Sequence, residues 1–548
     1  MNYEVRKDYS LLCKEVILAI YEFIEMAGAE MLDKRTLEKL RNKLTKKHNL
    51  TPPRNIELVA AYNQLVDQQA IEPNETVLNF IMKRRVRTLS GIANITVMLK
   101  AFGCPGQCIF CPTQPGMPKS YFSNQPAMLR AVRNDFDAYT QVKARLNGLK
   151  TQGHDISKID IRTAGGTWSS YLDDYQEHFI KSIYYALNQG AGDIEDLETA
   201  NKKIKELKLE DLILENETAT SRCVGLWVET RPDWITKKEI HKLRRFGVTG
   251  IELGVQTTDD KVNEFNKRGH NLEQSVAATK LCRDSGLKIC HHLMPNLPTS
   301  TLESDLQSIS DTFEKDILNP DYIKIYPCMV VPFTELANMV EKDPSLFKAY
   351  SDKELFELLA KTKSIVPEYC RIIRILRDFP SDLVLKGSKT LNMRQLLKDH
   401  KIQCKCVRCR EIKDEQFELE NVRIKADEYR SNQGTEYFIQ AYEPNLDKLI
   451  GLVRLRTVDN QEDVFIEEIK DCALIRELHV YGKTQGLKRK QTSTSQHVGI
   501  GTQLMNFAED KAKSLGYNKV AVISAIGTRQ YYEKLGYQKQ GTYMVKEL

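Results

Sequence analysis

The chain has 548 residues, of which 41% are hydrophobic and 28% charged, and its formal net charge is +6. This composition indicates a globular protein of about two to four domains and excludes a mostly disordered or fibrous chain. The apolar stretch 11–24 is interrupted by Lys14, Glu15 and Glu22, so we expect no signal peptide, no membrane span and a cytoplasmic location. Thirteen cysteines should then be reduced, which makes clustered ones candidates for metal or redox chemistry.

A basic, helical segment opens the chain. Val16, Ile20 and Phe23 repeat at helical spacing, and a second apolar helical pattern follows Pro52 and Pro53. We therefore expect residues 1–85 to form a small helical domain. Its clustered lysines and arginines suit a polyanion, and a solvated helix face is the alternative explanation.

Six short β-rich runs then alternate with helical stretches. This alternation predicts a parallel sheet that curves into a full or partial (βα) barrel, within a domain spanning residues 86–370. Each run ends in a polar or Gly/Pro segment, and barrel enzymes place their chemistry at that rim. The runs are 95–99, 159–163, 224–228, 250–253, 288–292 and 322–326.

A cysteine cluster follows the first run, with Cys-x3-Cys-x2-Cys spacing in Cys104, Cys108 and Cys111. Three thiolates on one tight loop can ligate three irons of a [4Fe–4S] cluster and leave the fourth iron open for a substrate. A zinc site that borrows a fourth ligand, or buried structural cysteines, are the alternatives. The spacing, the following proline and the preceding strand favour iron–sulfur.

The cluster spacing resembles that of the radical-SAM superfamily, whose open iron binds S-adenosylmethionine to generate a 5′-deoxyadenosyl radical. The resemblance implies that Gly165-Gly166-Thr167 is the glycine-rich segment beside the cofactor, although a plain tight turn would explain a glycine pair equally. Arg231 and Gln256 at corresponding rim positions are expected to bind the cofactor, and Glu229 is a catalytic candidate. Surface ion pairing is the competing explanation for these charged residues.

A new α/β pattern runs from residue 416 to the end. Gln496, Gly499, Ile500 and Gly501 precede an amphipathic helix, where free N–H groups can meet a pyrophosphate. This segment resembles the Q/R-x-x-G-x-G/A signature of GNAT acetyltransferases. The resemblance implies that the strand Glu477-Leu478-His479-Val480 pairs with the pantetheine arm of acetyl-CoA. Near the thioester, Tyr531, with Tyr532 as second candidate, would protonate the leaving thiolate, unless the pair is only core.

The two signatures together resemble the Elp3 family, the catalytic subunit of Elongator, nearly from end to end. That family carboxymethylates wobble uridine 34 of tRNA. The radical abstracts hydrogen from the acetyl methyl group, the resulting carbon radical adds to uridine C5, and thioester hydrolysis leaves a carboxymethyl group. The further stretches that carry the resemblance include 87–93, 128–131, 229–232, 251–256, 267–270, 377–380, 476–482 and 543–546.

The resemblance also implies partners and further contacts. Lys158 falls where the family contacts acetyl-CoA. A tRNA anticodon stem-loop and a low-potential electron donor would be partners, and a homodimer is possible. Contacts to the phosphates of tRNA are expected from the N-terminal basic residues Lys34, Arg35, Lys83, Arg84 and Arg85.

A second cysteine cluster, Cys404, Cys406 and Cys409, resembles the zinc-binding linker of prokaryotic members and defines a linker at 371–415. Zn²⁺ would need a fourth ligand, either His400 or a distant residue. A second iron–sulfur centre is the alternative that the tight spacing disfavours. We expect this linker to clamp the two catalytic domains together.

Two departures from the eukaryotic members bear on function. The compact spacing between the first two cluster cysteines indicates a prokaryotic-type member that works without the other Elongator subunits, and 113–117 replaces a glycine-rich stretch. The rival functions are a protein lysine acetyltransferase with a structural iron–sulfur domain and a tRNA-binding scaffold with degenerate sites. No base beside an amine acceptor is identifiable for the first, and the intact cysteines, glycines and tyrosines argue against the second.

Overall fold

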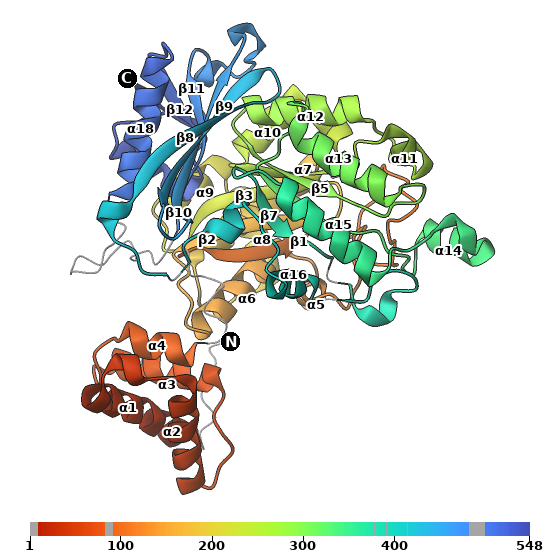
Figure 1. Ribbon diagram of the computed structural model, residues 1–548. Coiled ribbons are helices and arrows are strands. Elements are labelled where there is room, and N and C mark those ends of the chain that lie inside the picture. Colours follow the sequence, from red (N-terminus) through yellow and green to blue (C-terminus); the bar gives the residue numbers. More distant parts are fainter. Residues whose placement is uncertain (1–8, 83–90, 378, 391, 414, 482–498) are drawn as a thin grey trace.

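The structure is a computed structural model that describes residues 9–82, 91–377, 379–390, 392–413, 415–481 and 499–548 (Figure 1). It contains a small N-terminal helical domain, a central parallel sheet surrounded by helices, and a C-terminal sheet with its own helices. Within the described ranges, no helix combines the length and the apolar character needed to cross a membrane.

The N-terminal domain consists of α1 (Ser10–Ala27), α2 (Lys34–Lys47), α3 (Asn55–Asp67) and α4 (Glu75–Ile81). Their apolar faces share a core of their own, which includes Val16 and Ile20. The domain hangs below the rest of the molecule in Figure 1. It touches the central domain where Gly153 lies against the side chains of Leu78 and Val59.

The central sheet is parallel throughout, and its strands lie side by side in chain order. β1 and β7 do not pair with each other, so the sheet forms the partial barrel that the sequence predicts. The strands are β1 (Ala93–Met98), β2 (Lys158–Ala164), β3 (Arg222–Thr230), β4 (Gly250–Gln256), β5 (Lys288–Leu293), β6 (Tyr322–Ile325) and β7 (Arg371–Arg374). β7 is a strand beyond the six expected runs, and it falls inside the range expected for the linker.

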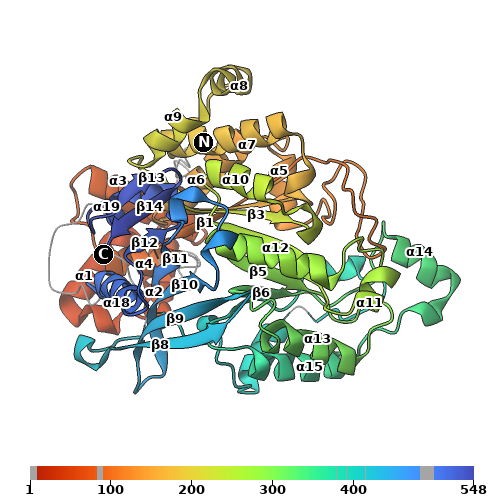
Figure 2. The same ribbon diagram turned by 90° about the horizontal axis from the view of Figure 1, so that it is seen from above.

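Helices cover the outer face of this sheet because their apolar sides pack on the buried strands. Figure 2 shows α10 and α12 lying along β3 and β5. The helices of the central region, including some that do not pack on the sheet, are α5 (Pro126–Val132), α6 (Ala138–Thr151), α7 (Asp173–Gln189), α8 (Leu197–Glu206), α9 (Leu209–Asn216), α10 (Lys237–Arg245), α11 (Asp260–Phe265), α12 (Leu272–Asp284), α13 (Leu302–Glu314), α14 (Glu335–Lys342), α15 (Asp352–Ile365), α16 (Met393–Asp399) and α17 (Val407–Arg410).

The C-terminal sheet has the order β13-β14-β12-β11-β10-β9-β8, and α18 covers the face turned away from the barrel (Figure 1). Most neighbouring strands in this sheet are antiparallel, but β11 and β12 are parallel. Its elements are β8 (Arg423–Arg430), β9 (Gly434–Glu443), β10 (Lys448–Val458), β11 (Ala473–Val480), α18 (Ile500–Ser514), β12 (Lys519–Val522), α19 (Arg529–Glu533), β13 (Gln538–Gln540) and β14 (Tyr543–Glu547).

A buried ionic network joins the two sheets. Arg476 of β11 donates to both oxygens of Asp321, at 2.9 and 2.6 Å, and Asp321 directly precedes β6. Arg456 of β10 donates to Asp284 at 2.9 Å. Burial opposes the charge on Asp321, but Arg476 and Arg454 outweigh it and hold the pKa of its carboxyl below the usual value. Paired charges at such depth hold the two domains in one fixed arrangement.

This arrangement places the two halves of the molecule at opposite ends of one barrel. Asp321 and Leu287, which contact Arg476, stand at the amino ends of β6 and β5. The cysteine loop follows the carboxyl end of β1, at the other end of the parallel strands. The barrel interior therefore lies between the cysteine loop and the C-terminal sheet.

Candidate active site

The loop after β1 brings hydrogen-bond donors to its cysteine sulfurs. The Thr167 hydroxyl lies 3.4 Å from Cys104 Sγ, and Arg268 Nη1 donates to Cys108 Sγ at 3.0 Å. All three cysteines of the loop are partly exposed residues, although burial raises the pKa of the Cys111 thiol to about 11. Donors of this kind stabilise thiolates, which are the form that ligates iron. The donor set thus fits a [4Fe–4S] cluster held by Cys104, Cys108 and Cys111.

Glycines let the backbone and Arg231 approach this loop. A Cβ on Gly165 would lie 3.0 Å from the Leu99 Cβ, and the φ angle of Gly165 is +131°. A Cβ on Gly106 would lie 2.2 Å from Arg231 Nη1. Larger residues would therefore push apart the segments that surround the cysteines.

A cavity of about 760 Å³ opens beside the loop, lined in part by Gln107, Arg231, Arg268 and His270. Arg231 donates to both oxygens of Asp233 at 2.9 Å, but its buried Nη1 has no hydrogen-bond partner. An unpaired buried guanidinium nitrogen is costly unless a ligand completes it. The cavity therefore fits an anionic group next to the cluster cysteines.

Gln256 stands at the same rim in a strained conformation. Its φ is +72°, which is uncommon for a residue other than glycine, and its buried side-chain oxygen has no hydrogen-bond partner. Such strain is often stored where a ligand binds. The rim thus offers an amide oxygen as well as a guanidinium group.

The interior of the barrel is charged, whereas barrel interiors are usually filled by branched apolar residues. Glu252 of β4 accepts from Arg162 Nη1 at 2.7 Å, from His292 Nε2 at 2.9 Å and from Lys324. The side chains of Arg162 and Glu229 keep exposed fractions of 25% and 23%. The interior is therefore not closed to water.

Glu252, Cys290 and His292 place their ligand atoms within 4.8 Å of one another. The chemistry of the set nevertheless disfavours a metal ion, because Lys324 and Arg162 already supply the positive charge next to Glu252. Burial raises the pKa of the Cys290 thiol, so it is a poor source of thiolate.

The C-terminal sheet offers an open strand edge. β10 pairs with β11 as far as Val480, but β12 pairs only with Ala473 to Ile475. Among the described residues, the backbone of 477–480 therefore has no strand partner on the β12 side. An amide-containing chain such as pantetheine can pair with such an edge.

The glycine loop and a tyrosine lie close to this edge. Gly499 has a φ of +100° and caps α18, and a Cβ on Gly501 would lie 2.9 Å from the Tyr531 hydroxyl. Tyr531 is 37% exposed, whereas Tyr532 is buried in the core. Burial raises the pKa of both phenols, which keeps them protonated. Tyr531 thus fits a proton donor, and the packing of Tyr532 fits the core explanation.

Comparisons with known proteins agree with these two sites. The Radical SAM superfamily model matches residues 98–311, the Radical_SAM C-terminal domain 320–402, and the Acetyltransferase (GNAT) family 406–537. The chain is 38% identical to the tRNA uridine(34) acetyltransferase of Methanocaldococcus jannaschii, with 96% of each covered. It is 33% identical to human Elongator complex protein 3, with 93% of each covered.

A solved structure is similar along most of its length. The archaeal Methanocaldococcus infernus Elp3 with an N-terminus deletion (1-46) superimposes with a TM-score of 0.70 at 35% identity, covering 84% of this chain and 100% of that one. The chain belongs to the Elp3 family. Its radical-SAM and GNAT domains imply S-adenosylmethionine, a [4Fe–4S] cluster and acetyl-CoA as ligands.

The remaining residues expected from the Elp3 resemblance are placed as follows. Lys158 begins β2, at the barrel end that faces the C-terminal domain, and burial lowers its pKa. Glu477 turns its carboxylate toward the barrel, where it accepts from Tyr322 and from Arg454, so only its backbone faces the open edge. Lys34 and Arg35 are exposed in the first turn of α2. Lys83, Arg84, Arg85 and Gln496 lie outside the described residues.

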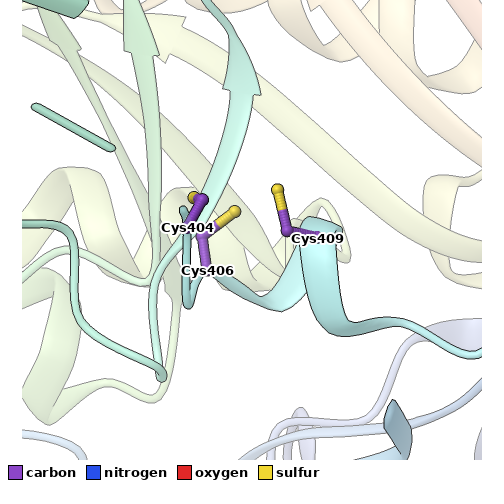
Figure 3. Close-up of side chains that lie close together, drawn as sticks. All are labelled: Cys404, Cys406 and Cys409. Carbon is purple, nitrogen blue, oxygen red and sulfur yellow. The ribbon is translucent and has the colours of Figure 1, made fainter. Parts of the chain in front are cut away.

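The sulfurs of Cys404, Cys406 and Cys409 all lie within 4.8 Å of one another, which fits one bound ion (Figure 3). His400 is not part of this group; its Nδ1 lies 2.9 Å from the Leu396 carbonyl, and its ring packs on Phe356.

The loop that carries these cysteines bridges the two domains. Val407 N donates to the Cys370 carbonyl at 3.0 Å, directly before β7. On the other side, Arg410 donates to Gln440 of β9 at 2.7 Å.

Several side chains of the site were not singled out from the sequence. Arg268 and Glu252 fall in stretches that carry the Elp3 resemblance, but no spacing rule links them to Cys108 or to each other. His292 and Lys324 are charged or polar residues inside runs expected to be buried. That mismatch between residue type and burial is the signal that could have identified them.

Proposed function

We propose that this protein carboxymethylates C5 of uridine 34 in tRNA, with acetyl-CoA as carbon source and S-adenosylmethionine as radical source. One observation carries the proposal: the open edge of β11 and the three-cysteine loop face opposite ends of the same barrel, and Arg476–Asp321 fixes their separation. Relatives named tRNA uridine(34) acetyltransferase, which extend over nearly the whole chain, support the substrate. They do not favour the lysine acetyltransferase alternative.

Cys104, Cys108 and Cys111 would hold the cluster and leave one iron for S-adenosylmethionine. Together the two groups, when bound and reduced by a low-potential donor, supply a 5′-deoxyadenosyl radical. Arg231, through its unpaired Nη1, would bind an anionic part of the cofactor, and Gln256 would bind a donor group of it. The backbone of Gly165-Gly166-Thr167 would form the wall next to it.

The acetyl-CoA site would use the open edge of 477–480 for the pantetheine amides and 499–501 for the pyrophosphate. Tyr531 would donate its phenolic proton to the leaving thiolate. Lys158, at the adjoining barrel end, would contact the acyl carrier.

The tRNA would be held through its anticodon stem-loop by the exposed Lys34 and Arg35, together with Lys83, Arg84 and Arg85 further along the chain. Zn²⁺ bound by Cys404, Cys406 and Cys409 would hold the interdomain loop in place. We propose that the protein acts in the cytoplasm without other Elongator subunits, as a monomer or a homodimer.

The test is anaerobic incubation of reconstituted protein with S-adenosylmethionine, dithionite, [2-13C]acetyl-CoA and tRNA, followed by nucleoside mass spectrometry. We expect labelled 5-carboxymethyluridine from the wild type and none from Cys108→Ala. Formation of 5′-deoxyadenosine with unmodified tRNA would contradict the assigned substrate. Acetyl transfer to a lysine without S-adenosylmethionine would restore the acetyltransferase alternative.

A further inference from the structure

A histidine–glutamate pair lies inside the barrel, and the cofactor and substrate contacts assigned above do not use it. His292 Nε2 of β5 and Glu252 Oε2 of β4 are 2.9 Å apart. Burial opposes the charge on Glu252, but Lys324, His292 and Arg162 outweigh it and hold the pKa of this carboxyl well below its usual value. An ionised carboxylate accepts only, so Nε2 carries the proton that is shared with Glu252, and in the neutral imidazole the lone pair is then on Nδ1.

Nδ1 of His292 is turned toward Glu229, whose side chain is 23% exposed. It has no hydrogen-bond partner among the described residues, and Glu229 Oε1 lies 3.7 Å from it. This distance is too long for a direct hydrogen bond and is one that a shared water can bridge. Glu229 itself is fixed because Tyr121 donates to its other oxygen at 3.1 Å.

The ring of His292 is held in one orientation. It packs edge-on against Tyr326, with ring centroids 5.4 Å apart, while Glu252 anchors Nε2. A base oriented by a carboxylate and presenting a free lone pair is the arrangement that activates water in hydrolytic enzymes.

The pair also lies between the two ligand sites. Tyr121, which contacts Glu229, follows Cys111 on the cluster loop. On the opposite side, Tyr322 of β6 contacts Glu477 of β11, two residues before Lys324 on the same strand. An acyl group that is delivered from the acetyl-CoA strand to the cysteine loop along the barrel axis would pass this pair.

We propose that His292 is the general base that hydrolyses the thioester formed on uridine, and that Glu252 is its positioning residue. This inference rests on the proposed function. A water gives its proton to Nδ1 while its oxygen bonds to the thioester carbonyl carbon. The carbon–sulfur bond then breaks, and the thiolate of coenzyme A leaves with the electron pair and takes the phenolic proton of Tyr531, while the proton on Nδ1 returns through solvent to the phenolate. The products are the carboxymethyl group and free coenzyme A, so no oxidant or reductant is needed.

The test isolates this step with an anticodon stem-loop that carries the preformed coenzyme A thioester of 5-carboxymethyluridine at position 34. Holoprotein without S-adenosylmethionine or reductant is mixed with this RNA, and released coenzyme A is measured by mass spectrometry. We expect His292→Gln to slow release by about 10²-fold or more, since general bases contribute about 10²–10⁴. Glu252→Gln should lower the rate while the dissociation constant of the RNA stays unchanged, as expected of a positioning residue.

His178→Gln, a histidine on the outer helix α7 that bonds to Asn201, is the matched control. In full turnover, His292→Gln should still form 5′-deoxyadenosine and should accumulate tRNA with the mass of bound coenzyme A. Release of coenzyme A at the wild-type rate by His292→Gln would overturn the inference. If the wild type hydrolyses the preformed thioester but makes no 5-carboxymethyluridine from acetyl-CoA, the proposed function fails and the assignment of the base stands.

Discussion

Asp321→Asn tests whether the buried ionic network fixes the two domains. Asp321 is fully buried and accepts from both terminal nitrogens of Arg476 and from the Ile289 amide at 2.9 Å. Removing its charge leaves Arg476 with Glu436 as its remaining carboxylate partner. Removing one partner of a buried ion pair lowers the free energy of unfolding by about 3–5 kcal/mol. At about 2–4 °C per kcal/mol for large domains, we expect Tm to fall by roughly 6–20 °C.

The assay is thermal unfolding of holoprotein followed by circular dichroism, with Glu547→Gln as control. The ion pair of Glu547 with Lys519 is exposed, so its loss should cost at most about 1 kcal/mol. A shift for Asp321→Asn no larger than that of the control would refute the reasoning.

The difference in stability between wild type and Asp321→Asn should depend on pH in a defined direction. Because the pKa of Asp321 is lowered in the folded state, its contribution is present above the unfolded-state pKa of about 3.9. That contribution is lost as pH falls through the folded-state value. The stability gap between wild type and Asp321→Asn should therefore stay constant from pH 8 to about 5 and narrow below about 4. A gap that widens on acidification would contradict the assignment.

Three further outcomes are expected. Gly165→Ala should reduce formation of 5′-deoxyadenosine by about tenfold or more with iron content unchanged. The added Cβ would press on Leu99, and the backbone of residue 165 has a positive φ angle. An unchanged rate would refute this close approach. Tyr531→Phe should slow acyl-thioester turnover by about 10²-fold at unchanged KM. Tyr532→Phe, which keeps its core packing, should leave the turnover rate within about threefold of the wild type. Equal effects of the two substitutions would contradict the proton-donor role of Tyr531. Cys406→Ser should abolish zinc in metal analysis and lower Tm, and full zinc retention would argue against this ligand set.

The fold was predictable from the sequence where the signal is local. The six expected runs each coincide with a strand, because their apolar residues and flanking turn residues act within a few positions. β7 was not predictable in this way, because its four residues include Arg371 and Arg374 with only two isoleucines between them, a pattern typical of a charged linker. Pairing of Ile372 with Ile323 of β6 makes this segment a strand, and that contact is not visible in local pattern.

The site divides in the same way. The spacing of Cys404, Cys406 and Cys409 sufficed to predict that their sulfurs gather, because they share one turn of chain. Glu252 and His292 stand on different strands, so their contact depends on strand order and register. The position of His400, whose ring packs on Phe356 and which is not grouped with the three cysteines, likewise depends on a contact distant in sequence.

The ionic network also affects whether the two domains can be stable apart. The radical-SAM matches end at residue 402 and the GNAT match begins at 406, yet Arg454, Arg456 and Arg476, on the far side of this boundary, contact Asp284 and Asp321 on the near side. A fragment cut there would lose Asp284 and Asp321 as partners of these arginines and would keep Glu436 and Glu477. We therefore expect the C-terminal sheet to be less stable alone than in the full chain, because part of its charge pairing is completed only when the barrel is present.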